Sequence, residues 1–317
     1  MSRVLLPFVT AGILALLCSP LIERVVARTR WPRWVVCWLV LLVLLSAVLL
    51  LGWLLVPPLA SDLLHVGSDL QAALQSLFQG LLGERILNVP VDPAQLASAA
   101  VARLRQWAGG DTVLLLGALG AAGVFAFILF WVLLAYFLLD EPRIAAGLLW
   151  LVPPARRSFA LHVWRDLAPT LRRYFAGVGV IAAYTTLAAY LGLGEILRLH
   201  HALLLALLTG ILELLPVLGP LAAAVIAGLV AIGQYGGGSH VIAYVGYATA
   251  LRVSIDQLVG PMVLGRAGRL PPVLVIFCFL VGGVLFGVTG VIVSVPVALA
   301  VKSLLTARHA ALTSSAL

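Results

Sequence analysis

The sequence predicts an all-α, polytopic membrane protein, and three observations lead to this prediction. Of the 317 residues, 63% are hydrophobic and only 10% are charged, and the mean hydropathy is +1.14. Such a chain cannot hide its apolar surface inside one water-soluble core. The basic residues, 20 against 12 acidic ones, flank the apolar runs. Basic residues in these places set orientation and contact anionic lipid, so we expect the lipid bilayer as a partner and no nucleic acid.

Residues 1–59 are expected to hold the N-terminal spans. Residues 4–20 form a short apolar stretch, and the arginine-rich loop after it is expected to be cytoplasmic. Residues 35–57 are the clearest spanning segment, because they are long enough to cross about 30 Å of hydrocarbon. The cysteines show no CxxC or Cys/His spacing, so we expect small apolar residues and neither a disulfide nor a metal site. They are Cys18, Cys37 and Cys278.

Residues 60–111 are net acidic and predict a small extracytoplasmic helical module. Leucines at helical spacing in this module favour packing or a subunit contact over a ligand surface. The region 112–173 is expected to combine a span at 112–139 with an amphipathic helix at 154–173. That helix would lie on the cytoplasmic membrane surface.

Residues 174–317 are expected to form the core of the protein. A span at 174–193 leads to His200 and His201, which would point to different sides of a helix. We therefore expect surface residues here and no metal site.

Charge placement in this core predicts two re-entrant helical hairpins, at 202–234 and 271–301, which would give about five full spans in the whole chain. Each arm of the first hairpin holds about 15 residues, or roughly 22 Å of helix, which is shorter than the hydrocarbon thickness. Two complete thin spans in each segment remain the alternative. Residues that interrupt or turn the two segments are Pro216, Gly219, Pro220, Gly287, Thr289 and Gly290.

Two carboxylates lie in the same region, Glu213 and Asp256. Glu213 precedes the first break near mid-membrane, where a lone charge costs at least about 2.5 kcal/mol. It should be protonated, paired or hydrated, which favours a role in proton or cation coupling; a helix-end Glu that bonds the hairpin backbone is the alternative. Asp256 follows Arg252 by four residues, so we expect a structural ion pair. Gln257 and Thr289 offer neutral ligands for a polar solute, or contacts between helices.

Enzyme motifs are missing from the sequence, which contains no Walker A motif, no Rossmann fingerprint in a strand–helix context, no HExxH and no GxSxG. We therefore expect no enzyme activity, no cofactor and no resident metal. Broken apolar helices indicate instead the site of a membrane carrier, because freed backbone groups at membrane depth must be buried in protein or face a watery cavity. Two hairpins that enter from opposite faces would suit alternating access.

Three motifs resemble the autoinducer-2 exporter family of membrane permeases: PVLGP at 216–220, DQLVGPMVLG at 256–265 and LPPVLVIFCFLVGGVLFGVTGVIVSVPVALAVKSLL at 270–305. A weaker similarity extends over nearly the whole chain. This resemblance implies a homo-oligomeric, multi-pass carrier of the bacterial inner membrane that exports a small polar solute or signal. Family members generally have a further apolar span before the segment that matches 5–23, so we expect the N-terminus of this chain outside.

Taken together, these observations predict a secondary transporter for a small solute or cation, coupled to H⁺ or Na⁺ through Glu213. A Na⁺(Li⁺)/H⁺ antiporter is one alternative, and a non-transporting membrane scaffold that acts through 60–111 is another. The residues expected along the substrate or ion path are Glu213, Pro216, Gly219, Pro220, Asp256, Gln257, Gly287, Thr289 and Gly290.

Overall fold

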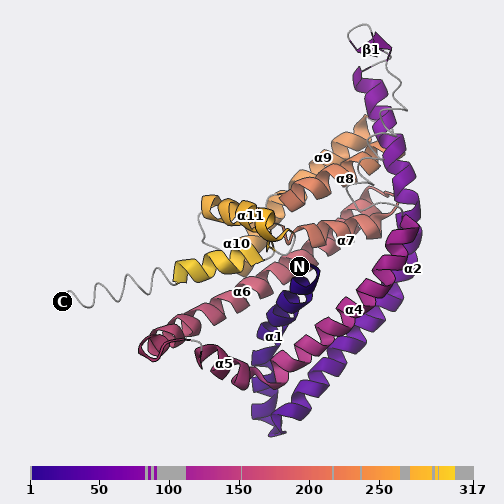
Figure 1. The fold of residues 1–317 in the computed structure, drawn as a ribbon. Helices are drawn as coiled ribbons and strands as arrows, with labels where there is room; N and C mark the ends of the chain where they lie inside the picture. The colour runs from indigo at the N-terminus through magenta and orange to yellow at the C-terminus, as the bar shows by residue number, and fades with distance from the viewer. Residues whose placement is uncertain are drawn as a thin grey trace, which may run out of the picture. The chain divides into compact units, whose positions relative to one another are not determined.

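The computed structural model describes residues 2–82, 85–86, 89–90, 112–150, 152–215, 218–235, 238–264, 272–287, 290–291 and 293–303. Most of these residues are helical, and the strands among them are two short antiparallel ones, β1 (Arg85–Ile86) and β2 (Val89–Pro90). The predicted all-helical class is therefore confirmed for the part of the chain that is described (Figure 1).

The helices follow one another along the chain as labelled in Figure 1. They are α1 (Ser2–Thr29), α2 (Arg33–Leu82), α4 (Thr112–Leu139), α5 (Glu141–Trp150), the 3₁₀ turn η1 (Pro154–Arg156), α6 (Arg157–Tyr190), the π-helical turn η2 (Leu191–Ile196), α7 (Ala202–Leu212), α8 (Leu218–Tyr235), α9 (Ser239–Val253), the π-helical turn η3 (Ser254–Val259), α10 (Gly260–Leu264) and α11 (Pro272–Phe286). A further apolar helix covers Val293–Ser303.

Four helical stretches of the described residues are long and apolar enough to cross a membrane: Leu6–Thr29, Arg33–Asp62, Arg157–Ile196 and Leu218–Tyr235. Four shorter apolar helices accompany them, among them α7 and the Gly123–Leu139 part of α4. The chain is thus a helical membrane protein with several spans. The count of about five full spans stays a prediction.

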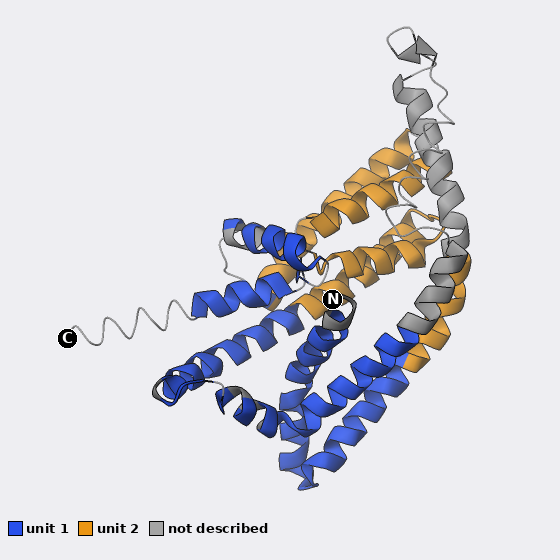
Figure 2. Ribbon diagram, viewed as in Figure 1, with its two compact units in different colours: residues 1–48, 120–177, 264–317 blue, residues 49–119, 178–263 orange. Residues whose placement is uncertain are grey.

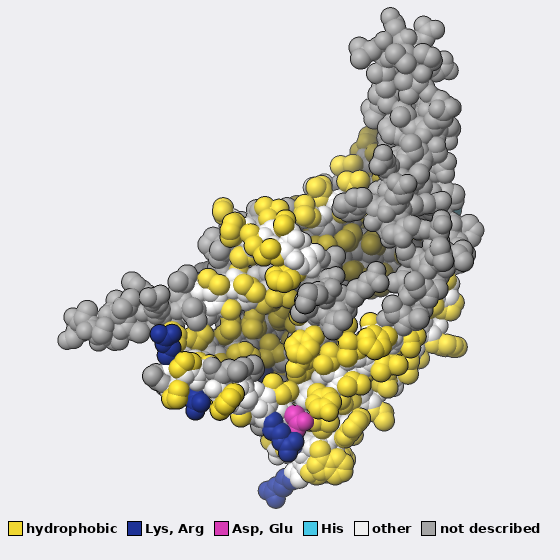
Figure 3. Space-filling model, viewed as in Figure 1, with side chains coloured by type: hydrophobic (Ala, Val, Ile, Leu, Met, Phe, Trp, Pro, Cys, Tyr) yellow, Lys and Arg dark blue, Asp and Glu magenta, His cyan; other side chains and the backbone are white. Residues whose placement is uncertain are grey.

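Large apolar side chains cover much of the surface that Figure 3 shows. Trp53, Met262 and Val284 are all more than three-quarters exposed, and many leucines and valines on the same helices are exposed as well. A water-soluble monomer rarely carries apolar surface on this scale. Contact with lipid acyl chains explains why these residues are favourable where they lie.

The chain divides into two compact units, coloured in Figure 2. Unit 1 comprises residues 1–48, 120–177 and 264–317, and unit 2 comprises residues 49–119 and 178–263.

The core of unit 1 joins α1, the start of α2 and the end of α4. One face of α1 is buried. It carries Ala11, Ala15, Cys18 and Ile22, which share this face because they recur at helical spacing. They pack in one cluster with Val36, Cys37, Val40, Leu41, Leu134 and Leu138. Cys18 and Cys37 thus act as small apolar residues, and all three cysteines are free thiols.

Polar contacts of Glu141 and Arg172 bind the helices of unit 1 to one another. The Glu141 carboxylate, at the start of α5, accepts hydrogen bonds from the Ser19 hydroxyl at 3.1 and 3.2 Å and pairs with Arg33. Arg172 of α6 donates from Nε to the Leu16 carbonyl oxygen at 3.0 Å. Pro20 leaves that carbonyl without its usual helical donor, because proline has no N–H.

The core of unit 2 is built by the end of α6 and by η2, α7, α8 and α9. Its buried residues are Ala189, Leu193, Leu199, Leu205, Ala206, Ala227, Val230, Ala231 and Tyr244. Small residues on α7 and α8 allow these two helices to approach closely, as is usual where helices pack inside a membrane.

His201 is less exposed than the sequence suggested. It has a left-handed backbone (φ 58°) immediately before α7, and its Nδ1 lies 2.8 Å from Oδ1 of Asp62 in α2. The side chains are 12% and 23% exposed, so the expectation of a surface residue is wrong for His201. His200, by contrast, is exposed.

Two helices are longer than expected. α2 runs without interruption from Arg33 to Leu82 and contains Pro57 and Pro58, although the sequence predicted a boundary at 59/60. α6 likewise joins the predicted surface helix at 154–173 to the predicted span at 174–193, and it contains Pro169. Proline within a membrane helix bends or weakens it without ending it when neighbouring groups satisfy the freed carbonyl.

Candidate functional site

Glu213 stands where α7 ends. Its backbone N–H donates to the Thr209 carbonyl at 3.2 Å, which completes the last turn of the helix. Its side chain is only 8% exposed. A carboxylate with so little exposure needs a partner, because burial without one disfavours the charge.

Arg252 provides that partner and binds a second carboxylate as well. Its Nη1 lies 3.4 Å from Oε1 of Glu213, and its Nε lies 2.7 Å from Oδ2 of Asp256. Arg252 and Asp256 are 43% and 44% exposed, so their mutual ion pair is more hydrated than the contact with Glu213. One guanidinium therefore holds two carboxylates, and the sequence had suggested only the contact four residues away.

The helix around Arg252 changes its winding at this point. The α-helical α9 ends at Val253, and the π-helical turn η3 covers Ser254–Val259 and so includes Asp256 and Gln257. Ser254 accepts a hydrogen bond from the Tyr184 hydroxyl at 3.1 Å and donates to the Leu251 carbonyl at 2.7 Å. The bond from Tyr184 holds the start of η3 against α6, and the bond to Leu251 ties Ser254 to the last turn of α9. Single π-helical turns occur frequently at functional sites.

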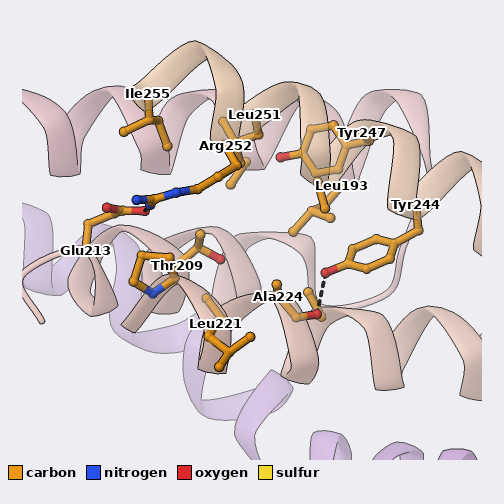
Figure 4. A pocket seen from close by; sticks show the side chains of 15 residues that line it. Leu193, Thr209, Glu213, Leu221, Ala224, Tyr244, Tyr247, Leu251, Arg252 and Ile255 are labelled. Atoms are coloured by element: carbon orange, nitrogen blue, oxygen red, sulfur yellow. Dashed lines mark hydrogen bonds and ion pairs between the residues drawn. The ribbon is translucent and has the colours of Figure 1, made fainter. Parts of the chain in front are cut away.

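A cavity of about 390 Å³ lies within unit 2 next to the Glu213–Arg252 pair. In Figure 4, Arg252 extends toward Glu213 on one side of the view, and Tyr244 lies on the other. Apolar side chains form most of the wall. The lining residues are Ala189, Leu193, Thr209, Glu213, Pro220, Leu221, Ala223, Ala224, Ala227, Tyr244, Tyr247, Ala248, Leu251, Arg252 and Ile255.

Three hydroxyl groups line the cavity, and each donates its hydrogen to a backbone carbonyl. Thr209 Oγ1 donates to Leu205 at 2.7 Å, Tyr244 Oη to Ala224 at 2.5 Å and Tyr247 Oη to Ala188 at 3.3 Å. Their oxygen atoms keep lone pairs that can accept hydrogen bonds. Sequence analysis missed both tyrosines, although Tyr244, Tyr247 and Leu251 recur at the spacing of one helix face, which was the available signal.

The break between α7 and α8 depends on a close backbone approach at Gly219. Gly219 is buried, and a Cβ atom added to it would overlap the carbonyl oxygen of Leu212. Pro220 follows in the first turn of α8, where its missing N–H costs nothing because first-turn donors have no helical acceptor. Pro216 lies outside the described residues. Of the predicted path residues that the structure describes, Glu213 and Pro220 line the cavity, while Gln257 is exposed on η3.

A second break follows α11 in unit 1. Gly287 has a left-handed backbone (φ 61°) just after the helix, and glycine adopts this conformation without steric cost. Gly282 and Gly290 approach so closely that a Cβ on either would overlap the backbone of the other. Thr289 lies outside the described residues. The Gly282–Gly290 approach therefore brings the chain before and after Gly287 into contact. The place of Gly287 and Gly290 along the path stays a prediction.

Within the described part of the chain, no group of three or more His, Cys, Asp or Glu side chains is close enough to share a metal ion.

The two arms of the first predicted hairpin differ in length. α7 has 11 residues, or about 16 Å of helix, and is too short to cross the hydrocarbon. α8 has 18 residues, or about 27 Å, which approaches a full span. The two arms are thus unequal, whereas the sequence predicted arms of similar length. The re-entrant arrangement stays a prediction.

Comparison with known proteins gives these features a family context. The chain is 25% identical to PerM of Escherichia coli (strain K12), provisionally named a permease, over 96% of this chain and 88% of PerM. It is 29% identical to YueF of Bacillus subtilis (strain 168), provisionally named a transport protein, over 54% of this chain and 46% of YueF, so it matches about half the length of that relative. The family model described as AI-2E family transporter matches residues 1–309. The chain therefore belongs to the AI-2E transporter family.

Proposed function

We propose that this protein is a secondary transporter of the bacterial inner membrane that exports a small polar solute by alternating access, and that Glu213 couples export to H⁺ or Na⁺ entry. The observation that supports this proposal best is the cavity of about 390 Å³ beside the Glu213–Arg252 pair, in a chain of a transporter family. Its volume lies within the range of small-molecule sites, about 300–1,000 Å³.

The arrangement of charges suits a coupled carrier. Arg252 touches Glu213 and Asp256 at once, so it keeps an acidic partner when a proton or Na⁺ neutralises Glu213. Loss of the Glu213 contact would release α9 from the end of α7, and these helices contribute to opposite walls of the cavity. Ion binding at Glu213 would thereby change the wall of the solute site, which is the link that coupling requires.

Alternating access in this proposal depends on the two breaks that follow α7 and α11. Freed backbone groups beside a cavity are typical of discontinuous helices in secondary transporters. We further propose a homo-oligomer, in line with the sequence-based expectation.

Liposomes that contain a pH-sensitive dye provide the test. Pulses of Na⁺, Li⁺ or K⁺ are applied to reconstituted wild type, to Glu213→Gln and to Glu195→Gln. Glu195 is the matched control, because it is exposed on η2 and does not line the cavity. We expect ion-driven proton movement in wild type and Glu195→Gln and its loss in Glu213→Gln. Equal movement in all three would refute the role of Glu213.

A Na⁺(Li⁺)/H⁺ antiporter is the second candidate, and the same Glu213–Arg252 contact favours it, since one carboxylate can exchange a proton for a metal cation. The assay separates the candidates. Full exchange without any organic solute supports the antiporter, whereas exchange that rises only when liposomes are loaded with a solute supports the exporter. The scaffold alternative depends on the module at 60–111, of which residues 91–111 lie outside the described residues.

A further inference from the structure

We propose that the solute bound in the unit 2 cavity is a small organic cation, with an amine or guanidinium head and a compact apolar body. This inference rests on the proposed transport function and assigns a substrate class to its site. Charge, hydrogen bonding and wall composition each support it.

The three charged groups beside the cavity carry a net negative charge, and two of them, Glu213 and Arg252, line its wall. Arg252 carries one positive charge between the carboxylates of Glu213 and Asp256, so the three groups together carry one negative charge when both carboxylates are ionised. A solute anion would meet a guanidinium whose Nη1 and Nε are already engaged and two carboxylates that repel it. A solute cation would be attracted by the same groups.

Hydrogen bonding at the cavity wall favours donors in the solute. The hydroxyl hydrogens of Thr209, Tyr244 and Tyr247 are directed to the carbonyls of Leu205, Ala224 and Ala188. Their oxygens therefore face any solute as acceptors, like the carboxylate of Glu213. Ammonium and guanidinium groups carry only donors, so they match this wall, whereas a carboxylate or phosphate carries acceptors alone.

Arg252 shows that the site already accommodates an organic cation. Its guanidinium Nη1 lies 3.4 Å from Glu213 Oε1, in the place that the head of a solute would take (Figure 4). Asp256 gives Arg252 a second partner at 2.7 Å, so a solute can displace Arg252 from Glu213 without leaving the guanidinium unpaired. Arg252 is thus an internal competitor for the solute site.

The rest of the wall suits an apolar body. Leu193, Leu221, Leu251 and Ile255 line the cavity with several alanines, and two tyrosine rings add aromatic surface. Such a lining contributes affinity by burial and leaves orientation to the few polar groups at one end.

The test compares three probes that share a phenyl ring and differ in charge: 2-phenylethylamine, 2-phenylethanol and 3-phenylpropanoate. Binding to the detergent-purified full chain is measured by calorimetry at neutral pH. We expect 2-phenylethylamine to bind at least about tenfold more tightly than the other two, which corresponds to one favourable charge interaction. Glu213→Gln should abolish this preference, and Glu195→Gln should retain it.

Two further variants test whether Arg252 competes with the solute for Glu213 or binds the solute itself. If Arg252 competes with the solute, Arg252→Gln should bind 2-phenylethylamine several-fold more tightly than wild type. Asp256→Asn should bind it several-fold more weakly, because Arg252 then has only Glu213 as partner. If Arg252→Gln fails to fold, the affinity of Asp256→Asn for 2-phenylethylamine decides by itself whether Arg252 is a competitor.

Preferential binding of 3-phenylpropanoate, or equal binding of all three probes, would overturn the substrate class. Ion-driven flux in liposomes would still support transport in that case. Tight binding of 2-phenylethylamine without flux would instead support the cation site and count against the transport function.

Discussion

Arg252 Nη1 and Glu213 Oε1 lie 3.4 Å apart, although the two residues are 39 positions apart in the chain. The contact joins the end of α9 to the end of α7 at one side of the unit 2 cavity. Because Glu213 is 8% exposed and Arg252 is 43% exposed, the carboxylate depends on the arginine more than the arginine depends on it.

Replacement of Arg252 should destabilise the protein through Glu213. Arg252→Gln leaves a largely buried carboxylate without its cation, which we expect to cost about 1–3 kcal/mol. The double variant Arg252→Gln/Glu213→Gln should recover part of that loss, because the unpaired charge is gone. Apparent thermal unfolding midpoints of detergent-purified protein measure both effects. Strictly additive losses would show that the two side chains do not interact.

Gly219 should tolerate no side chain. Gly219→Ala places a Cβ against the Leu212 carbonyl oxygen, and we expect a loss of about 1–3 kcal/mol from the forced backbone shift. Gly246→Ala is the matched control, since its Cβ would meet nothing within 4 Å on α9. That control should be neutral or slightly stabilising, because alanine favours helix over glycine by about 1 kcal/mol. The thermal midpoints of the two variants give the comparison, and similar midpoints would mean that the close approach is unimportant.

The contact between Arg172 and Leu16 should depend on Pro20. Arg172→Gln removes the donor to the Leu16 carbonyl and should cost about 0.5–1.5 kcal/mol. In a Pro20→Ala background, residue 20 regains an N–H for that carbonyl, so the same substitution should cost less. Thermal midpoints of the four proteins in this cycle report the coupling. An unchanged cost of Arg172→Gln in the Pro20→Ala background would contradict the interpretation.

Asp62 should stabilise the start of α7 through His201. Asp62→Asn removes the charge from a contact of 2.8 Å between side chains that are 23% and 12% exposed, and we expect a loss of about 1–3 kcal/mol. The chain offers a matched control in Asp166→Asn, since Asp166 and His162 form a more exposed pair at 3.7 Å. Exposed pairs contribute about 0–1 kcal/mol, so the control should change little. Thermal unfolding of both variants provides the measurement, and equal effects would place His201 among ordinary surface residues.

Sequence reasoning reached furthest where the relevant interaction is local. The four-residue spacing of Arg252 and Asp256 indicated an ion pair, and these residues lie 2.7 Å apart in the structure. The break between α7 and α8 was likewise visible in the prolines and glycine of 216–220. Continuous helices were harder to predict, because α2 and α6 pass through prolines that in water-soluble proteins often end a helix.

The sequence by itself determined the helical membrane class, since hydropathy and charge depend on composition and on short-range spacing. Only the tertiary structure decided that Arg252 reaches Glu213 as well as Asp256, that three hydroxyls direct their hydrogens to carbonyls, and that His201 meets Asp62. Apart from the Thr209 bond and the Arg252–Asp256 pair, which are local, each of these contacts joins residues from different helices. Helix packing brings such residues together, and helical periodicity shows which face a residue occupies but not which distant helix lies against that face.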